Sequence, residues 1–190
     1  MSEKLEIVRY DPGWPSVFSA ERDRLAAALG SLALRIDHNG STSVPGLAAK
    51  PVIDIQISVL RLHPMEAYAA ELTRLGYVHV PHADDSFCPF FHRPAAWPHT
   101  HHVHVVQSGG VEERRTLAFR DYLREHPEAA RAYEDLKRRL ASQHGASDFS
   151  ARQAYAEAKT QFVSALTERA LAEGHPRSLL NPRPTVRIGS

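Results

Sequence analysis

Between Val52 and Val59 the chain alternates apolar and polar positions without a break, which predicts a β-strand. One face of this strand carries only aliphatic side chains, those of Ile53, Ile55, Ile57 and Val59. The other face carries Val52, Asp54, Gln56 and Ser58. Burying a carboxylate without a partner is costly, so Asp54 indicates either a solvated sheet face or a functional site.

The remaining periodicity predicts a mixture of short strands and longer helices. Strands are expected at residues 5–9, 32–38, 77–80, 86–92 and 99–107. Helices are expected at residues 11–30, 64–76, 111–126 and 150–174, and a further helix is expected to begin at residue 127. This order predicts an α+β (α/β) fold, in which helices flank a mixed β-sheet and a C-terminal helical bundle follows.

The order of the elements also divides the chain into parts. Residues 1–108 are expected to form an α/β core, and residues 109–173 are expected to form helices that pack on it. Pro176, Pro182 and Pro184 predict that residues 174–190 form a flexible tail.

Composition narrows the range of partners. The formal net charge of the 190 residues is +1, and the absence of a basic stripe disfavours long nucleic acid as a ligand. No apolar run approaches the roughly 18 residues that a membrane span needs, so no membrane partner is expected. The single cysteine, Cys88, excludes an internal disulfide and favours a cytoplasmic location. These features leave the oligomeric state open.

A glycine–serine turn precedes the acidic strand. Gly40 lets the backbone pass close to a ligand, and Ser41, Thr42 and Ser43 add hydroxyl donors beside the backbone amides. Such turns also occur as plain loops, but this one leads directly to the strand that carries Asp54. The combination indicates a ligand-binding site.

Two histidines are predicted to share one face of a later strand. In residues 99–107, alternation places His102 and His104 opposite Val103 and Val105. Imidazoles at positions i and i+2 can reach one metal ion, bind phosphate or act as a general base. The alternative is a pair of polar residues on an exposed face. If this strand lies near the acidic strand, His102 and His104 face the same cavity as Asp54.

Residues 38–55, His-Asn-Gly-Ser-Thr-Ser-Val-Pro-Gly-Leu-Ala-Ala-Lys-Pro-Val-Ile-Asp-Ile, resemble the signature of the GrpB-like family. This family belongs to the nucleotidyltransferase superfamily related to DNA polymerase β, and some of its members are fused to dephospho-CoA kinase. Weaker matches are found at residues 10–15, 102–104, 117–123 and 155–159. The resemblance therefore covers about residues 5–166.

The resemblance implies a nucleotidyltransferase-like sheet and a set of site residues. The residues implied to bind nucleotide are Gly40, Ser41, Thr42, Ser43 and Lys50. Asp54 and Lys159 are the implied catalytic residues, with Lys159 supplying charge for the leaving pyrophosphate. The implied metal ligands are Asp54, Gln56, His102 and His104, and the expected ion is Mg²⁺ or Mn²⁺, with Zn²⁺ as the alternative. Arg114, Arg115 and Arg120 are further candidates for closing over a phosphate.

Gln56 departs from the pattern of the superfamily, whose enzymes usually carry a second acid at this position. An amide oxygen is neutral and holds Mg²⁺ weakly, which puts a two-metal site in doubt. Three functions are therefore considered. We favour metal-dependent transfer of a nucleotidyl group to a small-molecule or protein acceptor. The alternatives are a module with reduced catalysis that binds nucleotide or phosphoester, and a metal-dependent hydrolase built on His102, His104 and Asp54.

Overall fold

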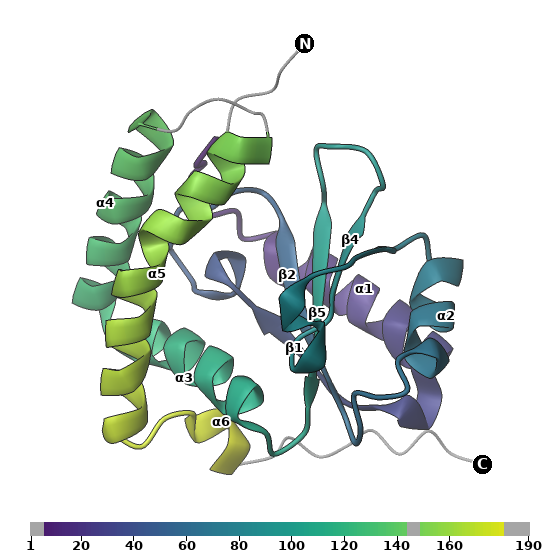
Figure 1. The fold of residues 1–190 in the computed structure, drawn as a ribbon. Coiled ribbons are helices and arrows are strands. Elements are labelled where there is room, and N and C mark those ends of the chain that lie inside the picture. Colours follow the sequence, from purple (N-terminus) through teal and green to yellow (C-terminus); the bar gives the residue numbers. More distant parts are fainter. Residues whose placement is uncertain (1–5, 144–148, 181–190) are drawn as a thin grey trace.

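A computed structural model describes residues 6–143 and 149–180 (Figure 1). Its centre is a five-stranded sheet in the order β1-β2-β5-β4-β3. The strands are β1 (Ala33–Asn39), β2 (Ile53–Val59), β3 (Val78–Val80), β4 (Phe90–Arg93) and β5 (His101–Gln107). β2 and β5 run parallel, and the other neighbouring pairs are antiparallel. The predicted mixed sheet is confirmed. Of the strand expected at residues 5–9, the described part contains an isolated bridge between Val8 and Ala49.

Helices cover both faces of the sheet. They are α1 (Trp14–Leu29), α2 (Glu66–Arg74), α3 (Val111–Glu125), α4 (Pro127–Gln143), α5 (Phe149–Ala172) and α6 (Arg177–Leu180). Figure 1 shows α1 and α2 on one side of the sheet and α3 to α6 on the other. Within the described residues, no helix is both long and apolar enough to cross a bilayer.

The aliphatic face of β2 forms the centre of the main core. Ile55 and Ile57 are fully buried and pack with Leu25 of α1 and Leu72 of α2. Burying one such side chain contributes about 1.5–3 kcal/mol to folding, so this face fixes the register of β2.

Most of the opposite face of β2 is buried, so a solvated sheet face does not explain its polar residues. Gln56 and Ser58 have no exposed surface, because α3 packs across this part of the sheet. Asp54, nearer the start of the strand, keeps 29% of its side chain exposed. Helix α3 thus buries one half of the polar face and leaves the half that carries Asp54 open.

The C-terminal helices also pack on the loop that follows the Gly-Ser turn. Val44 and Leu47 of this loop form a second core cluster with Leu123 of α3 and Tyr133 of α4. The turn is therefore held between the sheet and the helices.

Part of the segment predicted to be a flexible tail is helical, since α6 spans Arg177–Leu180. The amide of Ser178 donates to Asp121 Oδ2 at 3.1 Å, and its hydroxyl accepts from Arg120 at 2.9 Å. These bonds hold α6 against α3, which the proline content alone did not indicate. Residues 181–190 lie outside the described part of the chain.

Candidate functional site

The Gly-Ser turn lies directly against the carboxylate of Asp54. Gly40 has φ 63° and ψ −171°, a conformation that favours glycine. A Cβ atom added to Gly40 would lie 2.1 Å from Asp54 Oδ2, so no other side chain fits between the turn and the strand. The turn and the acid, which the sequence predicts to form one site, therefore lie directly against each other.

The three hydroxyls of the turn have different surroundings. Ser43 Oγ donates to Gly40 O at 2.6 Å, and Thr42 Oγ1 donates to Val52 O at 3.3 Å, so these two groups stabilise the turn itself. Ser41 and Thr42 both line the cleft described below, and Ser41 also lies near the Tyr133 phenol. Of the three predicted hydroxyls, Ser41 is thus the one best placed for a ligand.

Asp54 and His102 occupy directly opposed positions on the parallel strands β2 and β5. His102 Nδ1 lies 3.3 Å from Asp54 Oδ1, which confirms that the two side chains face the same cavity. Burial by itself would raise the pKa of Asp54. The hydrogen bond and charge of His102, with the charges of His104 and Lys159, hold that pKa below its ordinary value instead. Asp54 is therefore an anion at neutral pH.

His104 lies one pleat further along β5, opposite Gln56. Its Nδ1 is 3.7 Å from the sulfur of Cys88, and its ring lies 4.9 Å from that of Phe90. Burial lowers the pKa of His104 to about 4, so the imidazole is neutral at physiological pH. Burial also raises the pKa of the Cys88 thiol to about 12, which leaves it protonated.

Gln56 is oriented by its neighbours beneath α3. Its Oε1 accepts hydrogen bonds from the Thr116 hydroxyl and from Asn39 Nδ2. Its Nε2 is buried and finds no hydrogen-bond partner among the described residues. Because both bonds use the oxygen that would bind a metal, Gln56 is poorly disposed to act as a ligand.

The predicted lysines converge on one tyrosine. Lys50 Nζ and Lys159 Nζ lie 4.3 Å and 4.4 Å from the centre of the Tyr155 ring. Burial lowers the pKa of Lys159, while the carboxylate of Asp54 opposes that shift. Both lysines line the same cleft as Ser41 and Asp54.

Sequence reasoning missed three charged side chains that hold the turn from α3 and α4. Arg124 Nε and Nη2 donate to Ser43 O at 3.0 and 2.8 Å. Glu134 Oε2 accepts from the Ala48 amide at 3.0 Å, and Lys137 Nζ donates to the carbonyl of the same residue. These groups satisfy backbone atoms of the loop on both sides of Pro45-Gly46.

Sequence reasoning also missed two histidines that extend the Asp54–His102 pair. His102 Nε2 lies 3.2 Å from His99 Nδ1, and the His99 ring stacks on His92 with centroids 3.8 Å apart. Asp54, His102 and His99 thus form a continuous chain of polar contacts, in which the donor and acceptor roles of the rings depend on their tautomers. His99 belongs to the same histidine-rich run as His102, but the path of the loop before β5 could not be predicted.

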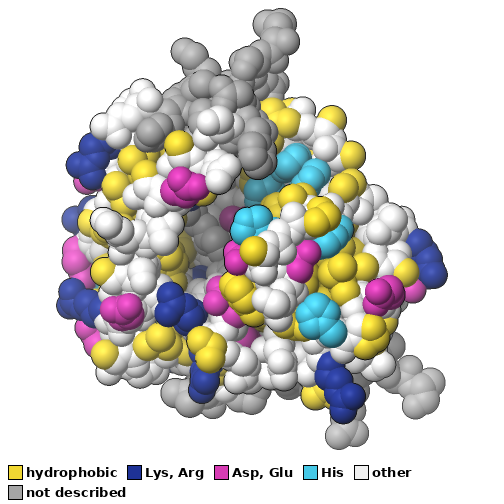
Figure 2. All heavy atoms as spheres, viewed as in Figure 1, with side chains coloured by type: hydrophobic (Ala, Val, Ile, Leu, Met, Phe, Trp, Pro, Cys, Tyr) yellow, Lys and Arg dark blue, Asp and Glu magenta, His cyan; other side chains and the backbone are white. Residues whose placement is uncertain are grey.

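These groups line a cleft of about 1080 Å³ between the sheet and the C-terminal helices. Its walls include Ser41, Lys50, Asp54, His102, His104 and Lys159, whereas Gln56 and Ser43 lie outside it. Figure 2 shows the hollow beside α5, with histidine side chains gathered along the sheet side. Across residues 6–143 and 149–180, no three His, Cys, Asp or Glu side chains are grouped so that they could hold a metal ion.

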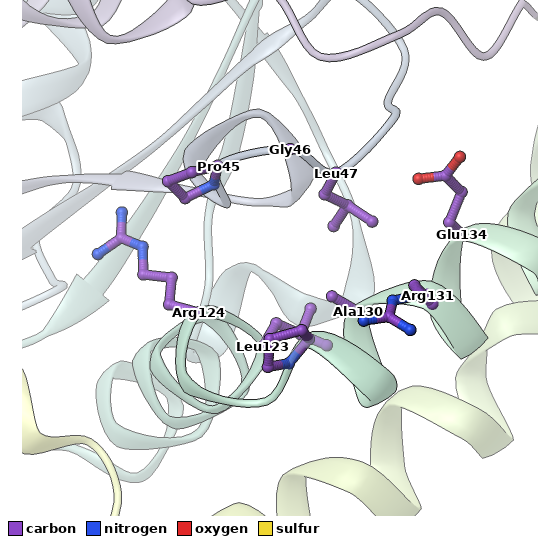
Figure 3. Close-up of a pocket in the computed structure, with 9 residues that line it drawn as sticks. Pro45, Gly46, Leu47, Leu123, Arg124, Ala130, Arg131 and Glu134 are labelled. Carbon is purple, nitrogen blue, oxygen red and sulfur yellow. The ribbon is translucent and has the colours of Figure 1, made fainter.

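A smaller pocket of about 230 Å³ lies behind the turn (Figure 3). Pro45, Gly46 and Leu47 form one wall, and Leu123 and Ala130 belong to the helices opposite. Its loop wall is the segment that Arg124 and Glu134 hold, so this pocket belongs to the support of the turn.

Arg120, one of the three arginines considered for binding phosphate, is used elsewhere. It is buried, with Nε 2.7 Å from Asp121 Oδ1 and Nη1 3.3 Å from Asp37 Oδ1. A guanidinium held between two carboxylates serves to join α3 to β1, and it does not line the cleft. Arg114 and Arg115 also lie outside the cleft lining.

A mixed sheet that holds a Gly-Ser turn against a strand carboxylate defines a nucleotidyltransferase-like protein. The comparison with known families agrees, since residues 4–169 match the GrpB protein family, which is part of the nucleotidyltransferase superfamily. The chain belongs to the GrpB family.

The similarity extends to a solved structure and to curated relatives. The crystal structure of conserved protein GrpB from Enterococcus faecalis has a TM-score of 0.78 and 34% sequence identity, covering 88% of this chain and 98% of that one. A UPF0157 protein of Pseudomonas aeruginosa is 38% identical over 173 residues, which cover 90% of this chain and 69% of the relative.

Some relatives are longer than this chain. A dephospho-CoA kinase of Mycolicibacterium paratuberculosis is 33% identical over 171 residues, covering 77% of this chain and 42% of the kinase. The match to a UPF0157 protein of Bacillus subtilis spans 41% of that protein. The shared unit thus occurs within larger proteins as well.

Proposed function

We propose that the protein binds a nucleotide or another phosphorylated small molecule in the cleft and, with a divalent ion, transfers a nucleotidyl group to a small-molecule or protein acceptor. The observation that carries this proposal is the contact between Gly40 and the Asp54 carboxylate. Transfer of a nucleotidyl group requires a metal ion and a phosphate cradle side by side. Asp54 would supply a ligand for the ion, and Gly40 belongs to the turn that would form the cradle.

The residues present fit one divalent ion better than two. Two donors bound at about 2.1 Å to a tetrahedral ion lie about 3.4 Å apart, and Asp54 Oδ1 and His102 Nδ1 are separated by 3.3 Å. Asp54 and His102 would hold the ion, and this donor set favours Mn²⁺ or Zn²⁺ over Mg²⁺. When bound, such an ion supplies charge neutralisation for phosphate oxygens.

The residues of the chain have distinct roles in this proposal. The Ser41 hydroxyl and the amides of the turn orient the phosphates, which is the main requirement of a phosphoryl-type transfer. Lys159 and Lys50 offset the charge of the leaving pyrophosphate. The C-terminal helices close one side of the cleft and keep the turn in place through Arg124.

The state of Gln56 supports a second function. Position 56 carries an amide in place of the second strand carboxylate of the superfamily pattern, and the oxygen of this amide already accepts bonds from Thr116 and Asn39. A module that binds nucleotide or phosphoester without turnover would need no such carboxylate. Measuring turnover and binding on the same sample separates the two functions.

The proposal is tested by incubating the protein with α-³²P-labelled ATP, GTP, CTP or UTP and Mg²⁺, Mn²⁺ or Zn²⁺. Label transfer and pyrophosphate release are measured with candidate small-molecule acceptors and with the protein itself. Asp54→Asn should abolish metal-dependent transfer, and Asp135→Asn, which removes an exposed carboxylate of α4, should retain it.

Nucleotide binding without turnover in every combination would favour the binding module. If no nucleotide raises the melting temperature or releases heat on titration at millimolar concentration, the nucleotide-based proposal is lost. The Asp54–His102 pair would then favour the metal-dependent hydrolase.

A further inference from the structure

The loop between β4 and β5 carries a histidine that the proposed transfer does not use. Residues 94–100 leave the sheet after Arg93 and return to it beside the same residue, because the Thr100 amide donates to Arg93 O at 2.8 Å. On the cleft side, His92 Nδ1 lies 2.9 Å from Pro94 O, and since a carbonyl only accepts, the ring is the donor. Both ends of the loop are therefore fixed to the sheet.

A buried ion pair with α1 anchors the same loop. Arg93 Nη2 donates to Glu21 Oε2 of α1 at 3.0 Å, and the Glu21 side chain is 5% exposed. The other oxygen of this carboxylate accepts from the Tyr77 hydroxyl at 2.9 Å. Because charged hydrogen bonds on both oxygens fix the position of the carboxylate, Arg93 ties the start of the loop firmly to α1.

This anchored loop brings the His99 ring to the outer nitrogen of His102. His99 Nδ1 lies 3.2 Å from His102 Nε2, which is within hydrogen-bonding distance. The His99 ring stacks on His92 with centroids 3.8 Å apart, and the Trp97 ring packs against it edge-on at 5.1 Å. Two aromatic contacts and one polar contact thus set the orientation of His99.

The two ring nitrogens of His102 have different neighbours, and this decides how the ring can bind an ion. Nδ1 faces Asp54 Oδ1 at 3.3 Å, whereas Nε2 faces His99. A neutral imidazole that gives the lone pair of Nδ1 to an ion carries its proton on Nε2. That proton requires an acceptor, and His99 Nδ1 is the atom in place to accept it.

We propose that His99 is a positioning residue of the candidate metal centre, because it accepts the Nε2 proton of His102 and so turns Nδ1 of that ring toward the ion. The inference rests on the metal pair of the proposed function and adds a residue outside that pair. A histidine ligand almost always donates its second ring N–H to a carboxylate, a carbonyl or water, and removing that partner lowers metal affinity about 10–100-fold. Here the acceptor is a second imidazole, held in place by its own loop.

Isothermal titration with Zn²⁺ or Mn²⁺ alone tests this role in the absence of nucleotide. His99→Phe keeps a ring that can stack on His92 but removes the acceptor, so the affinity for the ion should fall about 10–100-fold. His99→Gln supplies an amide oxygen as the acceptor and should recover most of that loss. His63→Phe, which removes an exposed histidine from the loop after β2, is the matched control and should bind the ion like the wild type.

A spectroscopic measurement on the wild type distinguishes this role from general support of the fold. Long-range ¹H–¹⁵N NMR spectra show which ring nitrogen of His102 carries the proton, and with Zn²⁺ bound this should be Nε2. Because no variant is needed, the result decides the question even where a substitution at His99 prevents folding.

Three results would overturn the role of His99. They are equal affinity of His99→Phe and the wild type, no recovery in His99→Gln, and a proton on Nδ1 of His102 with Zn²⁺ bound. In each case Asp54 and His102 could still hold the ion, so the proposed transfer keeps its own test. If the wild type binds neither ion at millimolar concentration, the inference falls together with the metal pair.

Discussion

Replacing Gly40 by alanine tests whether the turn and Asp54 form one structural unit. The backbone of Gly40, at φ 63° and ψ −171°, lies in a region that costs other residues about 1–3 kcal/mol. The added Cβ would lie 2.1 Å from Asp54 Oδ2 and 2.7 Å from its Cγ, so the carboxylate must move. Moving it breaks the charged hydrogen bond with His102, which adds about 1.5–3 kcal/mol.

The expected loss for Gly40→Ala is therefore about 2.5–6 kcal/mol, out of a total of about 5–15 kcal/mol for a typical domain. Gly46→Ala is the matched control, because its φ is 79° but nothing lies within 4 Å of the added Cβ. The control should lose about 1–2 kcal/mol from backbone strain alone. Urea unfolding followed by tryptophan fluorescence measures both values. Equal losses for the two variants would refute the close contact.

Three further predictions follow from the same contacts. Asp54→Asn should change the free energy of unfolding by less than about 1 kcal/mol, because the amide oxygen can still accept from His102; a loss of several kcal/mol in urea unfolding would show a structural role. The free energy of unfolding of the wild-type protein should rise between pH 7 and pH 10. The pKa of Lys137 in the folded state, about 7, lies below that of a lysine in the unfolded chain, so the unfolded chain binds more protons in this range. Unfolding titrations of Lys137→Met should lack this component of the rise, and an unchanged slope would contradict it. Arg124→Met removes the donors to Ser43 O and should lower the free energy of unfolding by about 1–3 kcal/mol, as measured by thermal melts. The same variant should bind nucleotide more weakly in a titration, and unaltered binding would show that the turn keeps its shape without α3.

The sequence by itself determined the parts of the site that depend on local patterns. Strict alternation from Val52 to Val59 identified β2 and the face on which Asp54 lies, because one register buries every isoleucine. Alternation in β5 likewise placed His102 on one face, and the parallel pairing then brings its ring to 3.3 Å from Asp54. The Gly-Ser turn was recognised because glycine lets the backbone pass close to a ligand, and the structure then shows that Gly40 has a positive φ.

Only the tertiary structure decided what supports this site. Arg124 and Lys137 contact the loop of the turn across 81 and 89 residues of sequence. Helical periodicity places Lys137, four residues after Tyr133, on the buried face of α4, but it does not show that the ammonium group meets the Ala48 carbonyl and lines the cleft. The same limit applies to Gln56, whose burial depends on where α3 crosses the sheet. Apolar burial is encoded by local repeats, whereas the partner of each buried polar group depends on how distant elements pack.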